Sequence, residues 1–155
     1  MPIQKLKEFL DGNKVKYVTV RHSTAYTAQE TAASAHIPGK ELAKTVVLRI
    51  DGRMAMAVLP ASHKLDIPLL KKALGAHDVE IVHEADFRDL FPGCDTGAMP
   101  PFGNLYGMDV LVDSVLAEDA EIAFNACSHS ELVKLSYADY IKLVKPRVAS
   151  FSVLR

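Results

Sequence analysis

Residues 43–59 read AKTVVLRIDGRMAMAVL, and this stretch decides the fold class. Two runs rich in apolar residues, 43–50 and 53–59, flank the dipeptide Asp51-Gly52. A two-residue hairpin turn needs a positive φ at both central positions, which Asp tolerates and Gly adopts freely. The stretch therefore predicts a β-hairpin of two long strands joined by a tight turn.

Short helices and strands alternate on both sides of this hairpin. The spacing of apolar residues predicts a helix over 3–11. Capping residues predict three more helices, which begin after Thr27, Asp66 and Ser136, and the second of these ends at Leu74. Thr27 and Glu30 form a capping box, and Asp66 and Gly75 bracket the third helix. Period-two alternation and short apolar runs predict further strands over 16–22, 79–82, 108–112, 121–126, 131–135 and 148–154, with a short helix over 85–90.

This order of elements lacks the regular strand–helix alternation of a doubly wound sheet. About seven strands with interspersed helices instead favour a mixed sheet, curved or partly closed, with helices packed outside it. The length of 155 residues suits one domain. We therefore expect a single α+β domain over 1–155.

Charge and composition limit the classes of partner. The formal net charge of −1 argues against a protein that coats long nucleic acid, although it leaves room for a small contact with one RNA end. No apolar run approaches the ~20 residues of a membrane span, and residues 1–5 show no signal region. We expect a cytoplasmic protein with no membrane partner and no DNA partner.

The two cysteines, Cys94 and Cys127, form no C-x-x-C pair and suggest no disulfide framework. We expect them to be buried or partly buried thiols. The six histidines show no metal-ligand spacing, and His83-Glu84 lacks the second histidine of an H-E-x-x-H motif. No metal, no cofactor and no Ser-His catalytic triad are predicted.

Lys44 is the first candidate for chemistry, because it leads into the run Thr45 to Leu48 of a buried strand. One interpretation is a solvated strand end. The other is a cation held at the mouth of a pocket, where it binds a phosphate or stabilises a developing oxyanion.

The second candidate is the loop 97–103, GAMPPFG. Its glycines allow a backbone to approach a ligand closely, while its two prolines stiffen the loop and remove two N–H groups. The loop is either a structural turn or a clamp for a carbonyl or oxyanion. The N–H donors left to face a ligand belong to Gly97, Ala98, Met99, Phe102 and Gly103.

His129 is the third candidate, in the polar turn 125–130. It could act as a general base, form a pocket wall or lie on the surface. Taken alone, the turn favours the surface position.

The ordered set of a Thr-Ala-Gln-Glu helix start at Thr27, Lys44-Thr45, the loop 97–103 and His129 resembles the YbaK and prolyl-tRNA synthetase associated domain family. The resemblance runs from about His22 to Tyr140. It implies an α+β domain with a mixed, barrel-like sheet. It also implies hydrolysis of the ester that joins a mischarged amino acid to the 3′ end of tRNA.

The resemblance also implies roles for single residues. Lys44 resembles the family's essential lysine, which holds the terminal adenosine end and its phosphate. Gly97 resembles the glycine whose N–H holds the aminoacyl carbonyl, and His129 the histidine that lines the amino-acid pocket. The remaining residues predicted to bind substrate are Thr45, Ala98, Met99, Pro100, Phe102 and Gly103.

The loop ending Pro100-Pro101-Phe102-Gly103 resembles the synthetase-like, alanine-clearing branch rather than the Ser-Pro-Leu-Gly type that acts on cysteinyl-tRNA. We therefore expect a small amino acid such as alanine on tRNA for proline. The expected partners are the acceptor end of aminoacylated tRNA and an aminoacyl-tRNA synthetase. A non-catalytic tRNA- or synthetase-binding module and a hydrolase of another small ester remain alternatives. A local basic rim for RNA could come from Lys40, Lys44, Arg49, Arg53, Lys64, Lys71 and Lys72, although a solvated surface of mixed charge fits most of these residues.

Overall fold

The predicted hairpin is the longest strand pair of the fold, in a computed structural model that describes residues 2–25, 27–92, 94–95 and 97–154. Strand β2 (Leu42–Ile50) pairs with β3 (Arg53–Pro60) from Ala43 opposite Pro60 to Ile50 opposite Arg53. Asp51 and Gly52 form the turn with φ of 47° and 84°, which confirms the predicted two-residue turn.

The hairpin lies inside a mixed sheet of eight strands in the order β1-β8-β7-β2-β3-β6-β9, with β5 paired to β2. The pairs β2–β7, β3–β6 and β6–β9 are parallel, whereas β1–β8, β7–β8, β2–β3 and β2–β5 are antiparallel. This arrangement confirms the α+β class with a mixed sheet. The other strands are β1 (Tyr17–Arg21), β5 (Val79–Ile81), β6 (Asp109–Asp113), β7 (Glu121–Asn125), β8 (Glu131–Ser136) and β9 (Arg147–Ala149).

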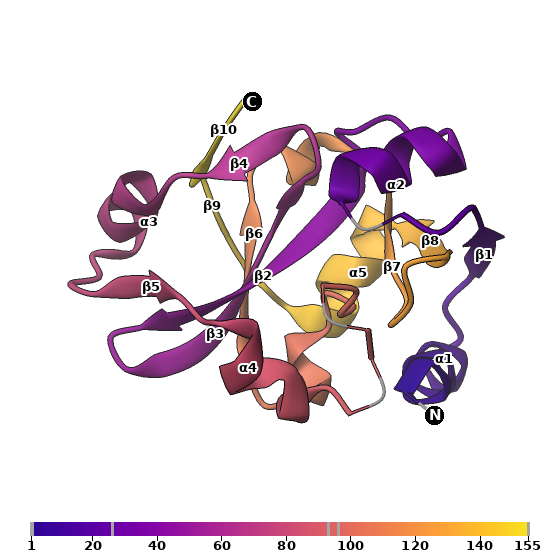
Figure 1. The fold of residues 1–155 in the computed structure, drawn as a ribbon, viewed down its shortest axis with the longest axis horizontal. Coiled ribbons are helices and arrows are strands. Elements are labelled where there is room, and N and C mark those ends of the chain that lie inside the picture. Colours follow the sequence, from indigo (N-terminus) through magenta and orange to yellow (C-terminus); the bar gives the residue numbers. More distant parts are fainter. Residues whose placement is uncertain (1, 26, 93, 96, 155) are drawn as a thin grey trace.

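Helices lie around this sheet, as Figure 1 shows, with α3 at the turn end of the hairpin and α2 toward the other end. They are α1 (Pro2–Gly12), α2 (Ala28–Ala35), α3 (Ile67–Leu74), α4 (Glu84–Phe87) and α5 (Tyr137–Val144), with short 3-10 turns η1 (Arg88–Leu90), η2 (Gly103–Leu105) and η3 (Leu116–Glu118). Within the described ranges, no helix has the length and apolarity needed to cross a membrane.

The predicted helix caps are confirmed. The side chains of Thr27, Asp66 and Ser136 accept the N–H groups of Glu30, Leu69 and Asp139. Gly75 ends α3 in the left-handed region, with φ of 66°. In the capping box the Glu30 carboxylate accepts the Thr27 hydroxyl at 2.9 Å, so the two side chains bind each other at the helix start.

The prediction of one strand over 148–154 is wrong. The chain forms β9, bends, and forms β10 (Ser152–Leu154), which pairs with the unpredicted strand β4 (His63–Leu65). The bend buries Phe151 completely. Phe151 N–H donates to the buried Asp113 carboxylate at 2.9 Å, and Phe151 carbonyl accepts from Asp66 N–H. Burial of one aromatic ring and its backbone therefore divides the segment into two strands.

The largest part of the core packs around Phe102, which is fully buried. Its ring meets those of Phe9, Phe124 and Tyr140 edge to face, at centroid distances of 6.1, 5.3 and 5.4 Å. Edge-to-face contacts stabilise such clusters beyond the burial of area alone. The loop 97–103 is thereby fixed to α1, β7 and α5.

Candidate functional site

Lys44 lies beside the end of β7, because β2 and β7 run parallel there. Ala43 pairs with Phe124, so Lys44 comes next to Asn125, the last residue of β7. Paired strands lie ~4.8 Å apart, and the turn that carries His129 begins directly after Asn125. The parallel pair thus brings Lys44 to the base of the His129 turn.

The ammonium group of Lys44 is held by the backbone. Lys44 is half-buried, and its Nζ donates to the carbonyl of His63 at 2.7 Å. His63 is itself fixed, since its Nδ1 lies 3.0 Å from Ser62 Oγ. A lysine held in this way is positioned rather than extended freely into solvent, which agrees with a cation fixed at a site.

Thr45 lies on the other face of the sheet from Lys44, because successive side chains of a strand alternate. Thr45 shares its face with Ala43 and Val47, which are buried in the main core, whereas Lys44 shares its face with Leu42. The structure therefore does not bring these two predicted residues to one surface.

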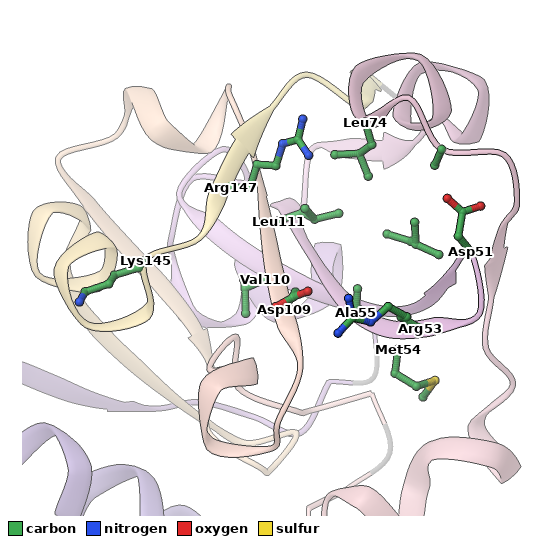
Figure 2. Close-up of a pocket in the computed structure, with 12 residues that line it drawn as sticks. Asp51, Arg53, Met54, Ala55, Leu74, Asp109, Val110, Leu111, Lys145 and Arg147 are labelled. Atoms are coloured by element: carbon green, nitrogen blue, oxygen red, sulfur yellow. The ribbon is translucent and has the colours of Figure 1, made fainter.

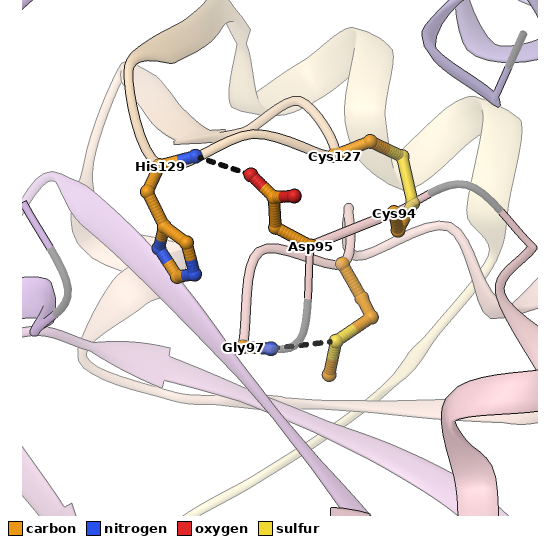
Figure 3. Close-up of a disulfide and its surroundings, with 6 residues drawn as sticks. Cys94, Asp95, Gly97, Cys127 and His129 are labelled. Carbon is orange, nitrogen blue, oxygen red and sulfur yellow. Dashed lines mark hydrogen bonds between the residues drawn. A yellow bond between two sulfur atoms is a disulfide. The ribbon is translucent and has the colours of Figure 1, made fainter. Parts of the chain in front are cut away.

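Gly97 and His129 do come together, as Figure 3 shows. Gly97 is exposed, has φ of +87°, and a Cβ built there would lie 3.6 Å from His129 Cε1. The N–H of His129 donates to Asp95 Oδ2 at 3.4 Å. The loop before Gly97 and the turn around His129 therefore face each other across one small space.

The Gly97 N–H points at Met99, whose Sδ lies 3.3 Å away. A thioether sulfur is a weak acceptor. A carbonyl oxygen or an oxyanion is a much better partner for this N–H group, so a ligand could displace the sulfur at little cost.

The expectation that five loop N–H groups face a ligand is wrong for two of them. Ala98 N–H donates to Asp95 carbonyl at 3.0 Å, and Phe102 N–H donates to Pro100 carbonyl at 2.8 Å. Gly103 is buried against Met108 and Val110, and a Cβ there would meet Val110 at 2.7 Å. The buried residues of the loop are Ala98, Met99, Pro100, Pro101, Phe102 and Gly103, which leaves Gly97 as the exposed predicted donor.

Cys94 and Cys127 form a disulfide, so the prediction of two thiols is wrong. The cysteines are 33 residues apart, and no spacing in the sequence indicates the pairing. Cys127 N–H donates to Ala98 carbonyl at 2.9 Å, and Asp95 N–H donates to Cys127 carbonyl at 3.0 Å. Residues 94–98 and 127–129 are thereby joined through both backbone and sulfur.

A cavity of about 410 Å³ borders the His129 turn and is lined by Arg21, His22, Ser130 and Glu131. The segment after β1 closes over this turn through two backbone hydrogen bonds. Ala25 N–H donates to His129 carbonyl and His22 N–H to Ser130 carbonyl, both at 3.0 Å. The turn thus contributes Ser130 to this cavity, and His129 is not among the residues that line it.

Asn125 is a polar residue of this region that sequence reasoning missed. Its Oδ1 is buried, and within the part of the chain that the structure describes it has no hydrogen-bond partner. Asn125 pairs with Leu132 and comes next to Lys44, and strand alternation places it on the Lys44 face. An unpaired buried acceptor is costly unless a ligand or water satisfies it. The polar end of an apolar strand was the signal that could have found it.

A second cavity, of about 400 Å³, contains none of the predicted site residues. Figure 2 shows it near the turn end of the hairpin, with Asp51 and Arg53 on one side and Leu74, Leu111 and Arg147 around it. Lys44 lies at the opposite end of β2 from this turn. Among the described residues, no group of three or more His, Cys, Asp or Glu side chains is placed to hold a metal ion.

Comparison with known proteins gives one family. Residues 22–143 match the model described as "Aminoacyl-tRNA editing domain". The chain is 31% identical over 114 residues to "Multifunctional Ser/Thr-tRNA deacylase ProXp-y" of Escherichia coli (strain K12), which covers 70% of this chain and 68% of the relative. It is 26% identical over 151 residues to "Prolyl-tRNA editing protein ProX" of Acetoanaerobium sticklandii, covering 94% and 92%.

Longer proteins and a solved structure also match. A "Proline--tRNA ligase" of Bacillus mycoides is 22% identical over 100 residues, and the match spans 17% of that enzyme. The crystal structure of hypothetical protein APE2540 superposes with a TM-score of 0.84 at 20% identity, over 96% of this chain and 99% of the other. That likeness concerns the fold.

Proposed function

Because the chain belongs to the aminoacyl-tRNA editing domain family, we propose that it removes a small amino acid, such as alanine, from the acceptor end of tRNA for proline. The chain is a trans-editing deacylase, which hydrolyses the ester bond of mischarged aminoacyl-tRNA. We propose the identity of the substrate, the residues that act on it and a cytoplasmic location for the reaction.

The observation that carries the proposal is the meeting of Gly97 and His129. The Gly97 backbone is exposed and lies against the His129 ring, with 3.6 Å from a Gly97 Cβ position to Cε1. We place the ester carbonyl oxygen on the Gly97 N–H, where it takes the place of Met99 Sδ. As water attacks, negative charge develops on this oxygen and the fixed N–H stabilises it.

Lys44 binds the nucleotide end of the substrate in this proposal. Its ammonium is anchored at 2.7 Å from the His63 carbonyl and therefore offers a fixed positive charge. A phosphate of the acceptor end suits that charge. The binding energy at the phosphate holds the ester in place for attack, which lowers the entropic part of the barrier.

Asn125 supplies an acceptor to the same substrate. Its unpaired Oδ1 lies on the Lys44 face. Both the α-ammonium group and the ribose hydroxyl of an aminoacyl-adenosine are hydrogen-bond donors. Either of them satisfies this buried oxygen in the bound state.

The chemistry needs modest help, because an aminoacyl ester is already activated. A water molecule attacks the fixed carbonyl, and the neighbouring ribose hydroxyl assists it, so no strong protein nucleophile is needed. His129 forms a wall of the amino-acid pocket and excludes larger side chains by clash. Such a size limit rejects large residues well and smaller residues poorly.

The names of the relatives define a second candidate substrate. The Escherichia coli relative is called a Ser/Thr-tRNA deacylase, and the Acetoanaerobium sticklandii relative a prolyl-tRNA editing protein. Serine and threonine therefore join alanine as amino acids to be compared. Docking on a prolyl-tRNA synthetase is the corresponding protein partnership, and it is supported by the match to part of the Bacillus mycoides ligase.

The test is deacylation of a panel of mischarged tRNAs by the wild type, Lys44→Ala and Lys72→Ala. The panel contains Ala-, Ser- and Thr-tRNA, with correctly charged Pro-tRNA as the species to be spared. The structure places Lys72 of the predicted basic rim, exposed, on α3 near the turn end of the hairpin and away from Lys44, so its variant is the matched control for loss of one lysine. We expect the wild type to release a small amino acid quickly. The deacylation rate should fall about 100-fold in Lys44→Ala and stay unchanged in Lys72→Ala.

The binding-module alternative gives a different result. Binding of the tRNAs without release above the buffer rate would overturn the proposed substrates. Release from free aminoacyl esters with indifference to tRNA would instead indicate a hydrolase of small esters.

A further inference from the structure

The Cys94–Cys127 disulfide connects the two segments that carry the proposed site (Figure 3). Cys94 lies three residues before Gly97, and Cys127 lies two residues before His129. Among the described residues it is the one disulfide, and it crosses the space between loop and turn. The bond is therefore placed where a small displacement changes the distance from the Gly97 N–H to His129.

Hydrogen bonds among the described residues also connect the two segments. They run from Asp95 N–H to Cys127 carbonyl, from Cys127 N–H to Ala98 carbonyl, and from His129 N–H to Asp95 Oδ2. The last is 3.4 Å long and its carboxylate is on an exposed residue. Without the sulfur bond, the alignment of the described parts of the loop and the turn depends on noncovalent contacts such as these.

The backbone at Cys127 supports a specific role for its sulfur. Cys127 has φ of +66°, a left-handed conformation that glycine adopts without steric cost and a cysteine does not. Asn or Asp can offset that cost with local side-chain hydrogen bonds, whereas cysteine cannot. In this turn the Cys127 side chain contributes its bond to Cys94, which holds the strained conformation in place.

We propose that Cys94 and Cys127 are redox-dependent positioning residues of the deacylation site, with a small thiol such as glutathione as their co-reactant. In the disulfide state the Gly97 N–H is aligned with the ester against His129. In the dithiol state the turn relaxes and this alignment is lost. The inference rests on the proposed function, because it assigns a consequence to the same site.

The exchange takes place at Cys94, since Cys94 is half-buried and Cys127 is only 6% exposed. A glutathione thiolate attacks Cys94 Sγ, the Sγ–Sγ bond breaks, and Cys127 leaves as a thiolate that takes up a proton. A second glutathione thiolate attacks the glutathione sulfur of the mixed disulfide and releases Cys94 as a thiolate, which is then protonated. Two electrons and two protons reach the protein, and two glutathione molecules become glutathione disulfide.

Reduction of the disulfide should lower kcat and leave KM nearly unchanged. Gly97 acts on the oxyanion of the transition state, so its misalignment lowers kcat. Lys44 lies on β2, outside both linked segments, so phosphate binding and KM change little. We expect a fall of about 10-fold in kcat on reduction, with KM within about twofold, because small misplacements of a reacting group are costly.

The experiment equilibrates the full chain with mixtures of reduced and oxidised glutathione, and alkylation with mass spectrometry counts the free thiols. Deacylation is then measured for the wild type, Cys94→Ser and Cys127→Gly. Cys127→Gly fits the left-handed turn and so removes the sulfur without adding strain. Cys94→Ser should show the rate of the reduced wild type in every mixture, and the rate of Cys127→Gly should not change with the mixture.

A second measurement keeps the inference separate from the proposed function. Hydrogen exchange of the Ala98, Cys127 and His129 amides should be slower in the oxidised wild type than in the reduced wild type or in Cys94→Ser. Equal kcat in both verified redox states, or no disulfide in oxidised glutathione, would overturn the inference. If no mischarged tRNA is hydrolysed in either redox state, the proposed function fails. Equal amide exchange in the two redox states would separately overturn the positioning role of the disulfide.

Discussion

At the scale of the residue, the backbone conformation of Gly97 favours glycine, because L side chains rarely adopt its φ of +87°. A Cβ at this position would lie in ordinary van der Waals contact with His129 Cε1, at 3.6 Å, in the space where we place the ester. The φ concerns the backbone, whereas the contact concerns the proposed ester site. A comparison of two glycines separates them.

Gly97→Ala should lose activity beyond its loss of stability. We expect the free energy of unfolding to fall by about 1 kcal/mol from left-handed strain and kcat to fall by about 100-fold as the N–H shifts. Gly52→Ala is the matched control, since Gly52 has φ of +84° and no described atom lies within 4 Å of its Cβ position. Denaturant unfolding and deacylation rates check both variants, and equal activity losses in the two would contradict the assignment of Gly97.

For Asn125 we expect weaker substrate binding with no loss of stability when the side-chain oxygen is removed. Asn125→Leu keeps the branched shape of the side chain and removes a buried oxygen that has no partner within the described residues, so the free energy of unfolding should stay level or rise by about 1 kcal/mol. KM for mischarged tRNA should rise about 10-fold, since a donor of the substrate loses its acceptor. Asn125→Asp retains an acceptor and should restore KM. Unchanged KM in Asn125→Leu would remove Asn125 from the site.

At the scale of the element, helix α5 fixes the loop 97–103 through the side chain of Tyr140. The Tyr140 hydroxyl donates to the Pro101 carbonyl at 2.7 Å, with both groups buried. The Tyr140 ring also packs edge to face against the Phe102 ring. Burial, together with the nearby Tyr137, raises the pKa of the Tyr140 hydroxyl well above 10. The loop therefore depends on a tyrosine that must stay protonated.

Alkaline pH should destabilise the protein through this contact. A group whose pKa is raised on folding stabilises the fold below its unfolded pKa of about 10, and that contribution is lost as pH rises further. The free energy of unfolding should fall above pH 10, with a slope that is shallower in Tyr140→Phe by up to about 1.4 kcal/mol per pH unit. At pH 7, Tyr140→Phe should cost about 1 to 2 kcal/mol, because the Pro101 carbonyl loses its donor. Parallel slopes for the two proteins would contradict this role.

Local chemistry determined which elements could be predicted. The hairpin turn at Asp51-Gly52 and the caps at Thr27, Asp66 and Ser136 depend on neighbouring residues, and all are confirmed. Strands β4 and β10 exist because residues far apart pair, as Leu65 does with Ser152. The Cys94–Cys127 bond likewise joins distant segments. Nothing within either short segment indicates its partner.

The predicted site shows the same division. Gly97 and His129 lie together because β7, its following turn and the disulfide bring them there, and only a resemblance to a family indicated that they share a site. Thr45 and Phe102 were predicted from their neighbours in sequence. Thr45 lies on the opposite face from Lys44, and Phe102 is fully buried in the core. Proximity along the chain was therefore a poor guide to proximity in the site.

At the scale of the whole molecule, charge limits how much of a tRNA the protein can contact. The net charge is −1. Two cations of the predicted basic rim are already paired, since Arg49 lies 2.7 Å from Glu80 and Lys40 lies 3.9 Å from Asp119. The surface thus offers no large excess of positive charge for the tRNA body, which favours recognition of the unpaired acceptor end.

Salt dependence measures the extent of this contact. For single strands, log K falls against log salt with a slope of about −0.7 per neutralised phosphate. A contact limited to the acceptor end, with one to three phosphates, predicts a slope of about −1 to −2 for log kcat/KM. Lys44→Ala should make the slope shallower by about 0.7, whereas Lys72→Ala, at the other end of the sheet on α3, should leave it unchanged. A slope steeper than about −5 would instead require broad contact with the tRNA body. In that case the cations would have to come from a docked partner, because this chain has 18 Lys and Arg against 19 Asp and Glu.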